Sequence, residues 1–225
     1  MTALVRMRVA GFVRSGRVLA PLITVLAILS VLYGGGPSSA AAAYGYSAVM
    51  LFPVLAWLTK LVLDAEPDVQ RQLARLTVGP VREATAGLLA AGILGAGVCL
   101  LAMLAPVPFG AITGPRIGIG VLLGVLAHVL ALLAALALGA LAGRPVTRRV
   151  LPGVAVLVTG SVLVIVLGLR GSIAPWLVPP VMATARALSD GTAPPPGTLA
   201  GLVTWTLAWC AATLAGYAVL RRARA

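Results

Sequence analysis

Few side chains in this sequence are suited to catalysis or metal binding, and they lie scattered among apolar residues. His128 is the only histidine, Cys99 and Cys210 are the only cysteines, and Lys60 is the only lysine. A zinc site needs closely spaced Cys or His ligands, and a free cysteine in an apolar run behaves as a small hydrophobic residue. We therefore expect no metal site, no disulfide and no cofactor bound by this chain.

The sequence also lacks a recognisable site for ATP hydrolysis. A phosphate-binding loop is glycine-rich and ends in Gly-Lys-Ser or Gly-Lys-Thr, whereas Lys60 follows Leu58 and Thr59. Ser161 offers a hydroxyl, but a nucleophilic serine needs a base beside it, and nothing in the sequence brings His128 to it. We expect the chain not to be an enzyme.

His128 itself has two interpretations. It lies in the apolar range 117–142, where a titratable side chain serves either as a proton or substrate site or as a polar contact between helices. No carboxylate lies inside an apolar range to act with it, which favours the contact between helices.

Composition places the chain in a lipid bilayer. Its 225 residues are 60% hydrophobic and 10% charged, with a mean hydropathy of +1.08, whereas soluble proteins average about 45–50% and about 25%. A soluble globular protein is excluded, and the net charge of +12 then indicates membrane topology instead of nucleic-acid binding.

The apolar residues form six ranges of the length that crosses a bilayer as a helix. We predict an all-α membrane protein, a single domain over residues 1–225, with spans at about 18–33, 44–63, 84–107, 117–142, 150–169 and 199–220. The first is short unless its helix begins near Phe12. The pairs Gly120 with Gly124 and Gly139 with Gly143 would permit close helix packing.

Basic residues predict the orientation. All 17 basic residues except Arg116, Arg170 and Arg186 fall on one side of the six spans, Arg224 near the C-terminus included. By the positive-inside rule that side is the cytoplasm of a bacterial cell, so both termini are cytoplasmic. A cleaved secretory signal is the alternative for the N-terminus, but its long basic region favours an uncleaved first span.

Residues 4–17 have the pattern of an amphipathic helix at the membrane surface. Val5, Val9 and Phe12 repeat at helical spacing, and Arg6 and Arg14 lie on a neighbouring face where they can meet acidic headgroups. Arg8 interrupts this pattern. The alternative is a basic flank without a separate helix.

The range 64–82 is polar and contains or adjoins four of the five acidic residues. Pro67 suits a helix start and Gly79-Pro80 a helix stop. Between them an apolar stripe of Val69, Leu73 and Leu76 lies opposite a polar face of Gln70, Arg71, Gln72 and Arg75. Such a helix either rests on headgroups or inserts into a groove of a soluble partner. Its mixed charges favour the partner.

The range 170–198 is external in this topology, yet it is apolar and rich in proline. We expect re-entrant or interfacial half-helices that cap a cavity, with an ordinary surface loop as the alternative. The residues that would form this cap are Ile173, Pro175, Trp176, Pro179, Pro180 and Met182.

This arrangement resembles the membrane subunits of ABC-2-type transporters, also called type V ABC exporters. The resemblance covers the order of elements along nearly the whole chain. At the level of residues it centres on 61–89, LVLDAEPDVQRQLARLTVGPVREATAGLL, which is similar to that family's acidic turn, coupling helix, small-residue break and third span.

The resemblance implies a permease that pairs with a second permease chain, identical or different. It also implies two copies of a separate ABC ATPase, which bind ATP and Mg²⁺ and drive export of a hydrophobic or amphipathic substrate such as a drug, antibiotic, lipid or peptide. Residues 173–182 would form the external gate. The residues coupling to the ATPase would be Asp64, Glu66, Asp68, Val69, Arg71, Gln72, Leu73, Arg75 and Leu76.

Two other functions are compatible with the sequence. One is an ATP-independent channel or secondary carrier that uses His128, and the other is a membrane scaffold or anchor. The substrate and the composition of the dimer are not specified by any motif.

Overall fold

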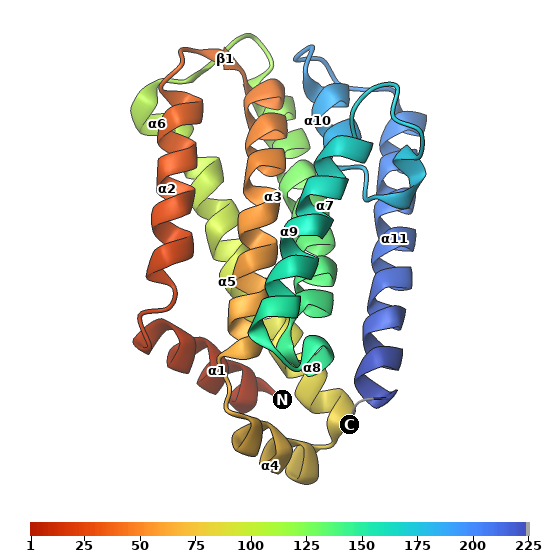
Figure 1. Ribbon diagram of the computed structural model, residues 1–225. Coiled ribbons are helices and arrows are strands. Elements are labelled where there is room, and N and C mark those ends of the chain that lie inside the picture. Colours follow the sequence, from red (N-terminus) through yellow and green to blue (C-terminus); the bar gives the residue numbers. More distant parts are fainter. Residues whose placement is uncertain (224–225) are drawn as a thin grey trace.

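The computed structural model describes residues 1–223, so Arg224 lies outside the described residues. The regular structure of these residues is helical apart from two two-residue strands, and the long helices run side by side as a bundle (Figure 1). Five of these helices are long and apolar enough to cross a membrane, and a bent pair at the N-terminus makes a sixth if it is one span. The architecture is that of a multi-pass membrane protein.

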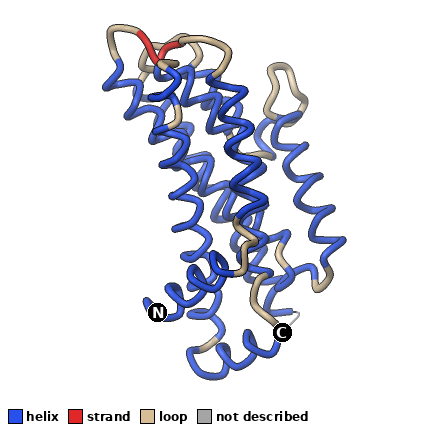
Figure 2. Tube along the Cα trace, turned by 90° about the vertical axis from the view of Figure 1, so that its left-hand side faces the viewer, coloured by secondary structure: helices blue, strands red, loops and turns tan. Residues whose placement is uncertain are grey.

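The bent pair consists of α1 (Thr2–Arg14) and α2 (Leu19–Tyr33), which meet at 75°. Gly16 has a φ of +71° in the turn between them, a conformation that glycine adopts without strain. As a result α1 lies across one end of the bundle (Figure 2). The 15 residues of α2 extend for only about 22 Å at the rise of an α-helix, short of the ~30 Å hydrocarbon core.

Two helices form the centre of the bundle, α3 (Ala40–Asp64) and α7 (Ile117–Ala142). Gly120, Gly124 and Gly139 of α7 let them approach closely. A Cβ at Gly124 would lie 2.6 Å from the ring of Tyr44, and one at Gly139 would lie 2.5 Å from the Cβ of Thr59. The small-residue spacing in range 117–142 therefore marks a contact within the chain.

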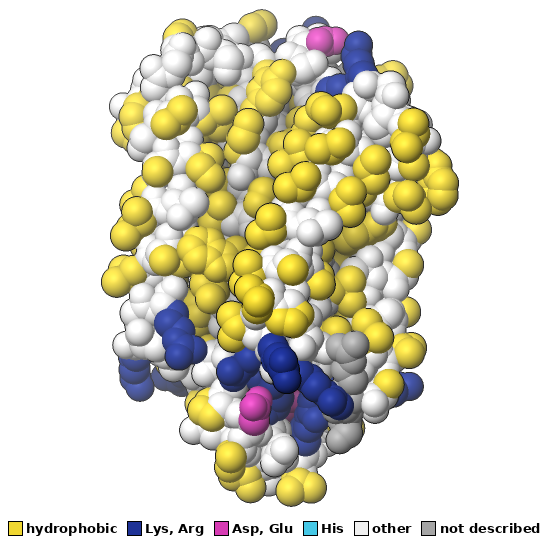
Figure 3. Space-filling model, in the orientation of Figure 1, with side chains coloured by type: hydrophobic (Ala, Val, Ile, Leu, Met, Phe, Trp, Pro, Cys, Tyr) yellow, Lys and Arg dark blue, Asp and Glu magenta, His cyan; other side chains and the backbone are white. Residues whose placement is uncertain are grey.

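Three further long helices surround this pair: α5 (Pro80–Leu104), α9 (Val150–Leu167) and α11 (Pro196–Ala223). Each exposes many apolar side chains, as expected of surfaces that face lipid. Figure 3 shows apolar side chains along the length of the bundle, with most of the Lys and Arg in view gathered below them.

We call the end of the bundle that holds α1, α4 (Asp68–Val78) and α8 (Arg144–Thr147) the charged end (Figure 1). The N-terminus and the end of α11 lie there too. The helix α4 connects α3 to α5, and Gly79, with a φ of +86°, separates it from Pro80 at the first position of α5.

The opposite end, which we call the strand end, holds the short elements. There β1 (Ser38–Ser39) pairs in parallel with β2 (Ile112–Thr113), beside the single helical turn α6 (Pro106–Phe109). The same end carries the 3₁₀ turn η1 (Pro175–Leu177) and α10 (Val181–Leu188), within the predicted range 170–198.

Each predicted apolar range coincides with a helix. The range 117–142 has the bounds of α7, and 150–169 ends two residues beyond α9. The helix of the second predicted span, α3, begins at Ala40 instead of residue 44. The Ser39 side chain caps this helix by accepting a hydrogen bond from the backbone N–H of Ala42.

Candidate functional site

A cluster of ion pairs at the charged end is centred on Glu83. This residue lies in the first turn of α5 and is 4% exposed. Its carboxylate accepts hydrogen bonds from Arg8 at 2.8 Å, from Arg75 at 3.5 Å, and from Arg221. One carboxylate thus joins α1, α4, α5 and α11.

Arg8 extends the cluster toward the turn before α4. Its guanidinium also donates to the carboxylate of Glu66 and, at 2.8 Å, to the backbone carbonyl of Glu83. The residue that interrupts the amphipathic pattern of range 4–17 is therefore the residue that ties α1 to the rest of the charged end. Val5 and Phe12 are buried beside it, as the apolar face of α1 predicts, while Val13 is exposed.

Asp64 closes a second connection, between α3 and α8. Its carboxylate pairs with the Lys60 ammonium, one turn earlier in α3, and accepts the backbone N–H of Arg144 at 2.6 Å. Lys60 is 3% exposed, so the pair is largely shielded from solvent, and loss of either partner would leave the other charge uncompensated.

Arg71 differs from its predicted position. We expected it on the exposed polar face of α4, but it is buried and donates to the carbonyl oxygens of Leu63 and Glu66 at 3.0 and 3.2 Å and to Asp68 at 3.2 Å. Burial lowers the pKa of Arg71, and the carboxylate of Asp68 partly offsets this effect. Arg71 is an anchor of α4, not a group available to a partner.

The apolar stripe of α4 points outward for the same reason. Val69, Leu73 and Leu76 are 68, 57 and 84% exposed, and Gln72 is exposed beside them. A helix that turns its arginine inward to a buried polar cluster must turn its opposite face out. The amphipathic helix is thus present as predicted, with its apolar face free among the described residues.

Most of the acidic residues around α4 form ion pairs within the chain and are not exposed at its surface. Asp64, Glu66 and Glu83 are engaged with cations of the chain itself, and their side chains are 13, 14 and 5% exposed, whereas the Asp68 side chain is 74% exposed. The part of Asp64, Glu66 and Asp68 in coupling to an ATPase stays a prediction. The buried charges hold α4 in place, and its exposed surface carries the apolar stripe beside the polar side chains of Asp68 and Gln72.

The range 170–198 is organised and held against the bundle. Pro179 and Pro180 are buried, Met182 is half-buried against Gly168, and α10 packs on α3 where Gly45 leaves room for Leu188. The Trp209 side chain donates to the carbonyl of Leu177 at 2.9 Å.

The other part of this range is open. Ile173 and Trp176 are 94 and 67% exposed, and Pro175 is exposed between them. The segment therefore has an anchored half, built around α10, and an exposed apolar tip, which includes η1.

His128 lies deep in the bundle and contacts α3. Its Nδ1 donates to the carbonyl of Gly124 at 2.8 Å, and its Nε2 lies within hydrogen-bond distance, 3.2 Å, of the Ser47 hydroxyl. Both ring nitrogens have partners inside the chain, which favours a contact between helices. The hydroxyl near His128 is that of Ser47, while the Ser161 hydroxyl has no hydrogen-bond partner among the described residues.

Sequence reasoning missed the centre of the ion-pair cluster. In the sequence Glu83 is only a neighbour of range 64–82, Arg144 and Arg221 only indicate topology, and Arg8 only interrupts an amphipathic pattern. A usable signal was present: Arg8 on an otherwise apolar face and Glu83 beside the third span are charges where the local pattern predicts none. The cluster forms only where α1, α5 and α11, which are far apart in sequence, meet beside α4.

Comparison of the chain with family models, with curated proteins and with solved structures finds no match in any of the three.

Proposed function

We propose that this protein is the membrane permease subunit of an ATP-driven exporter of the ABC-2 type. In this proposal all six apolar ranges span the cell membrane of a bacterium, α1 lies in the cytoplasmic headgroup region, and the charged end with both termini faces the cytoplasm. A separate ATPase, in two copies, binds ATP and Mg²⁺, and a second permease chain completes the pathway. The substrate is hydrophobic or amphipathic.

The observation that carries the proposal is the orientation of α4. Its apolar stripe is exposed at the charged end, and its inner face is fastened through Arg71 and Arg75. Three exposed apolar residues on one short helix fit a groove on a partner, because an amphipathic helix binds through such a stripe. In water they would be left uncovered.

In this proposal the ion-pair cluster transmits a displacement of α4 to the membrane-spanning helices. Arg75 of α4 shares the carboxylate of Glu83 with Arg8 and Arg221, so α4 is joined to α1, α5 and α11. Movement of α4 therefore changes contacts of two long helices and of the surface helix together. At the strand end α10 and η1 would act as the external gate.

The test replaces the apolar stripe and measures association with the ATPase. In the double variant Leu73→Asp/Leu76→Asp we expect at least a tenfold loss of the co-purifying ATP-binding cassette subunit and loss of ATP-dependent transport into inverted vesicles. Both residues are exposed, so the thermal stability of the chain should change little.

The matched control is Gln70→Asp, which adds a negative charge to the same exposed helix outside both the stripe and the predicted coupling residues. It should retain association and transport. Unimpaired association and transport in the double variant would rule the proposal out.

A further inference from the structure

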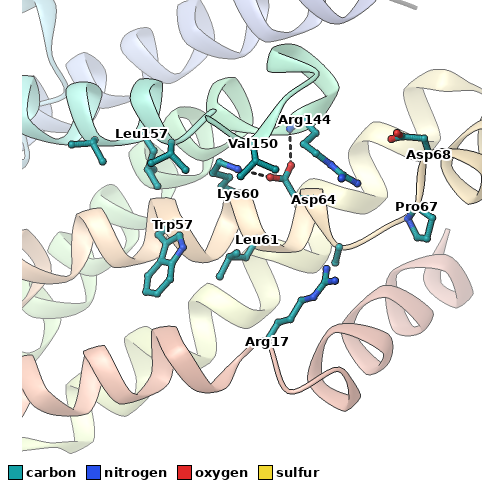
Figure 4. Close-up of a pocket in the computed structure, with 13 residues that line it drawn as sticks. Arg17, Trp57, Lys60, Leu61, Asp64, Pro67, Asp68, Arg144, Val150 and Leu157 are labelled. Carbon is teal, nitrogen blue, oxygen red and sulfur yellow. Dashed lines mark hydrogen bonds and ion pairs between the residues drawn. The ribbon is translucent and has the colours of Figure 1, made fainter. Parts of the chain in front are cut away.

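A cleft of about 910 Å³ opens on the side of the bundle near the charged end, between α3 and α9 (Figure 4). Its wall toward the middle of the bundle is apolar and includes Trp57, Leu61 and Leu157. Its other end is polar and includes Arg17, which follows α1, and Arg144 at the start of α8. The cleft is amphipathic along the axis of the bundle.

The charges at the polar end leave an excess of positive charge. Asp64 is engaged with Lys60, and Asp68 pairs with Arg71 at 3.2 Å. Among residues 1–223 no carboxylate forms an ion pair with Arg17 or Arg144, and the Nε of Arg144 is buried without a hydrogen-bond partner. In Figure 4 the side chains of Arg17 and Arg144 both extend toward the C-terminal end of α3.

The position of the cleft relates it to a bilayer. The surface helix α1 crosses the end of the bundle, and Arg17 follows it directly, so the polar end of the cleft lies where headgroups would lie. The apolar wall continues from there along α3 and α9 and includes Val154 and Val158, which are 42 and 55% exposed.

We propose that this cleft binds an acidic phospholipid of the surrounding membrane, with the lipid phosphate between Arg17 and Arg144 and an acyl chain along Trp57 and α9. Two guanidinium groups without carboxylate partners complement the phosphate, because arginine binds phosphate oxygens through paired N–H donors. The apolar wall selects a lipid over a free phosphate ion. The inference depends on the chain lying in a membrane and does not depend on an ATPase partner.

The test uses the fluorescence of Trp57. Substitution of Trp176, Trp205 and Trp209 by Phe leaves Trp57 as the only tryptophan of the chain. The protein is reconstituted in phosphatidylcholine bilayers that contain a small fraction of either phosphatidylglycerol or phosphatidylcholine brominated on its acyl chains. We expect brominated phosphatidylglycerol to quench Trp57 with an apparent affinity at least about fivefold higher than that of brominated phosphatidylcholine. About fivefold is the factor that one basic residue contributes to binding an acidic lipid surface.

Arginine variants locate the site. Arg17→Gln combined with Arg144→Gln should abolish the preference for phosphatidylglycerol, whereas Arg82→Gln, an exposed arginine at the same end outside the cleft, should preserve it. Equal quenching by the two lipids, or an unchanged preference in the double variant, would overturn the proposal.

Two further arms complete the test. Inorganic phosphate at millimolar concentration should leave the preference for phosphatidylglycerol unchanged. Loss of that preference would assign the site to a soluble phosphate and overturn the proposal of a lipid site. If the triple Phe variant does not fold, native mass spectrometry of the chain with its four tryptophans intact compares the numbers of phosphatidylglycerol and phosphatidylcholine adducts. We expect more phosphatidylglycerol than phosphatidylcholine adducts, and fewer phosphatidylglycerol adducts in the double arginine variant. Equal numbers of the two adducts would contradict the proposal.

Discussion

At the scale of single residues, Glu83 is the most connected charge in the described chain. Three arginines from three helices share its carboxylate, and the side chains of Arg8 and Arg221 are only 7 and 8% exposed. Buried ion pairs add little net stability when they are complete, but removal of one partner leaves an uncompensated charge. The cluster therefore selects one arrangement of α1, α4, α5 and α11 over others.

Glu83→Gln should destabilise the protein by about 3 kcal/mol, since it removes the negative charge that faces three arginines and leaves their geometry in place. Thermal unfolding in detergent measures the effect. Asp68→Asn is the control, because the Asp68 side chain is 74% exposed and an exposed pair contributes about 1 kcal/mol or less. Equal stability of the two variants would show that Glu83 does not hold the charged end together.

At the scale of elements, α4 and α7 show what determines which face of a helix packs against the rest of the protein. The outer face of α4 is apolar because its inner face holds Arg71 and Arg75 against polar groups. The helix α7 is apolar on all sides, and what distinguishes the face toward α3 is side-chain size, with glycine where Tyr44 and Thr59 approach. Close approach gains dispersion contacts in a bilayer, where there is no hydrophobic drive between helices.

Gly139→Ala should therefore cost about 1–3 kcal/mol of stability, because the added methyl group would lie 2.6 Å from the carbonyl oxygen of Ala56, a backbone atom that cannot rotate away. Thermal unfolding of the purified protein tests this. Gly118→Ala in the same helix meets no atom within 4 Å and should be neutral or slightly stabilising. A neutral Gly139→Ala would mean that α3 and α7 can separate at little cost.

At the scale of the whole molecule, the two ends of the bundle differ in charge and in structure. The charged end joins α1, α4, α8 and both terminal regions, while the strand end carries β1, β2, η1 and α10 (Figure 1). Most of the basic residues lie at the charged end, where Figure 3 shows them as a band below the apolar surface. In a cell membrane this asymmetry predicts a single orientation.

Thiol labelling tests that orientation. Ile173→Cys at the strand end should react with a membrane-impermeant maleimide in intact cells, and Leu76→Cys at the charged end should react only after the membrane is permeabilised. Both positions are highly exposed, at 94 and 84%, whereas the native Cys99 and Cys210 are buried and provide the unlabelled background. The reverse labelling pattern would place the charged end outside the cell.

The helices, their approximate bounds and the basic asymmetry of the chain follow from the sequence, because hydropathy, capping residues and charge act over short stretches of chain. The pattern also predicted an amphipathic α4. It did not predict that Arg71 faces inward, or that Glu66 and Glu83 are engaged by Arg8, because hydrophobic periodicity defines two faces and leaves open which one meets the protein. That choice belongs to the tertiary structure. Only there do α1, α5 and α11, distant in sequence, meet and provide the buried charges that turn the apolar stripe of α4 outward.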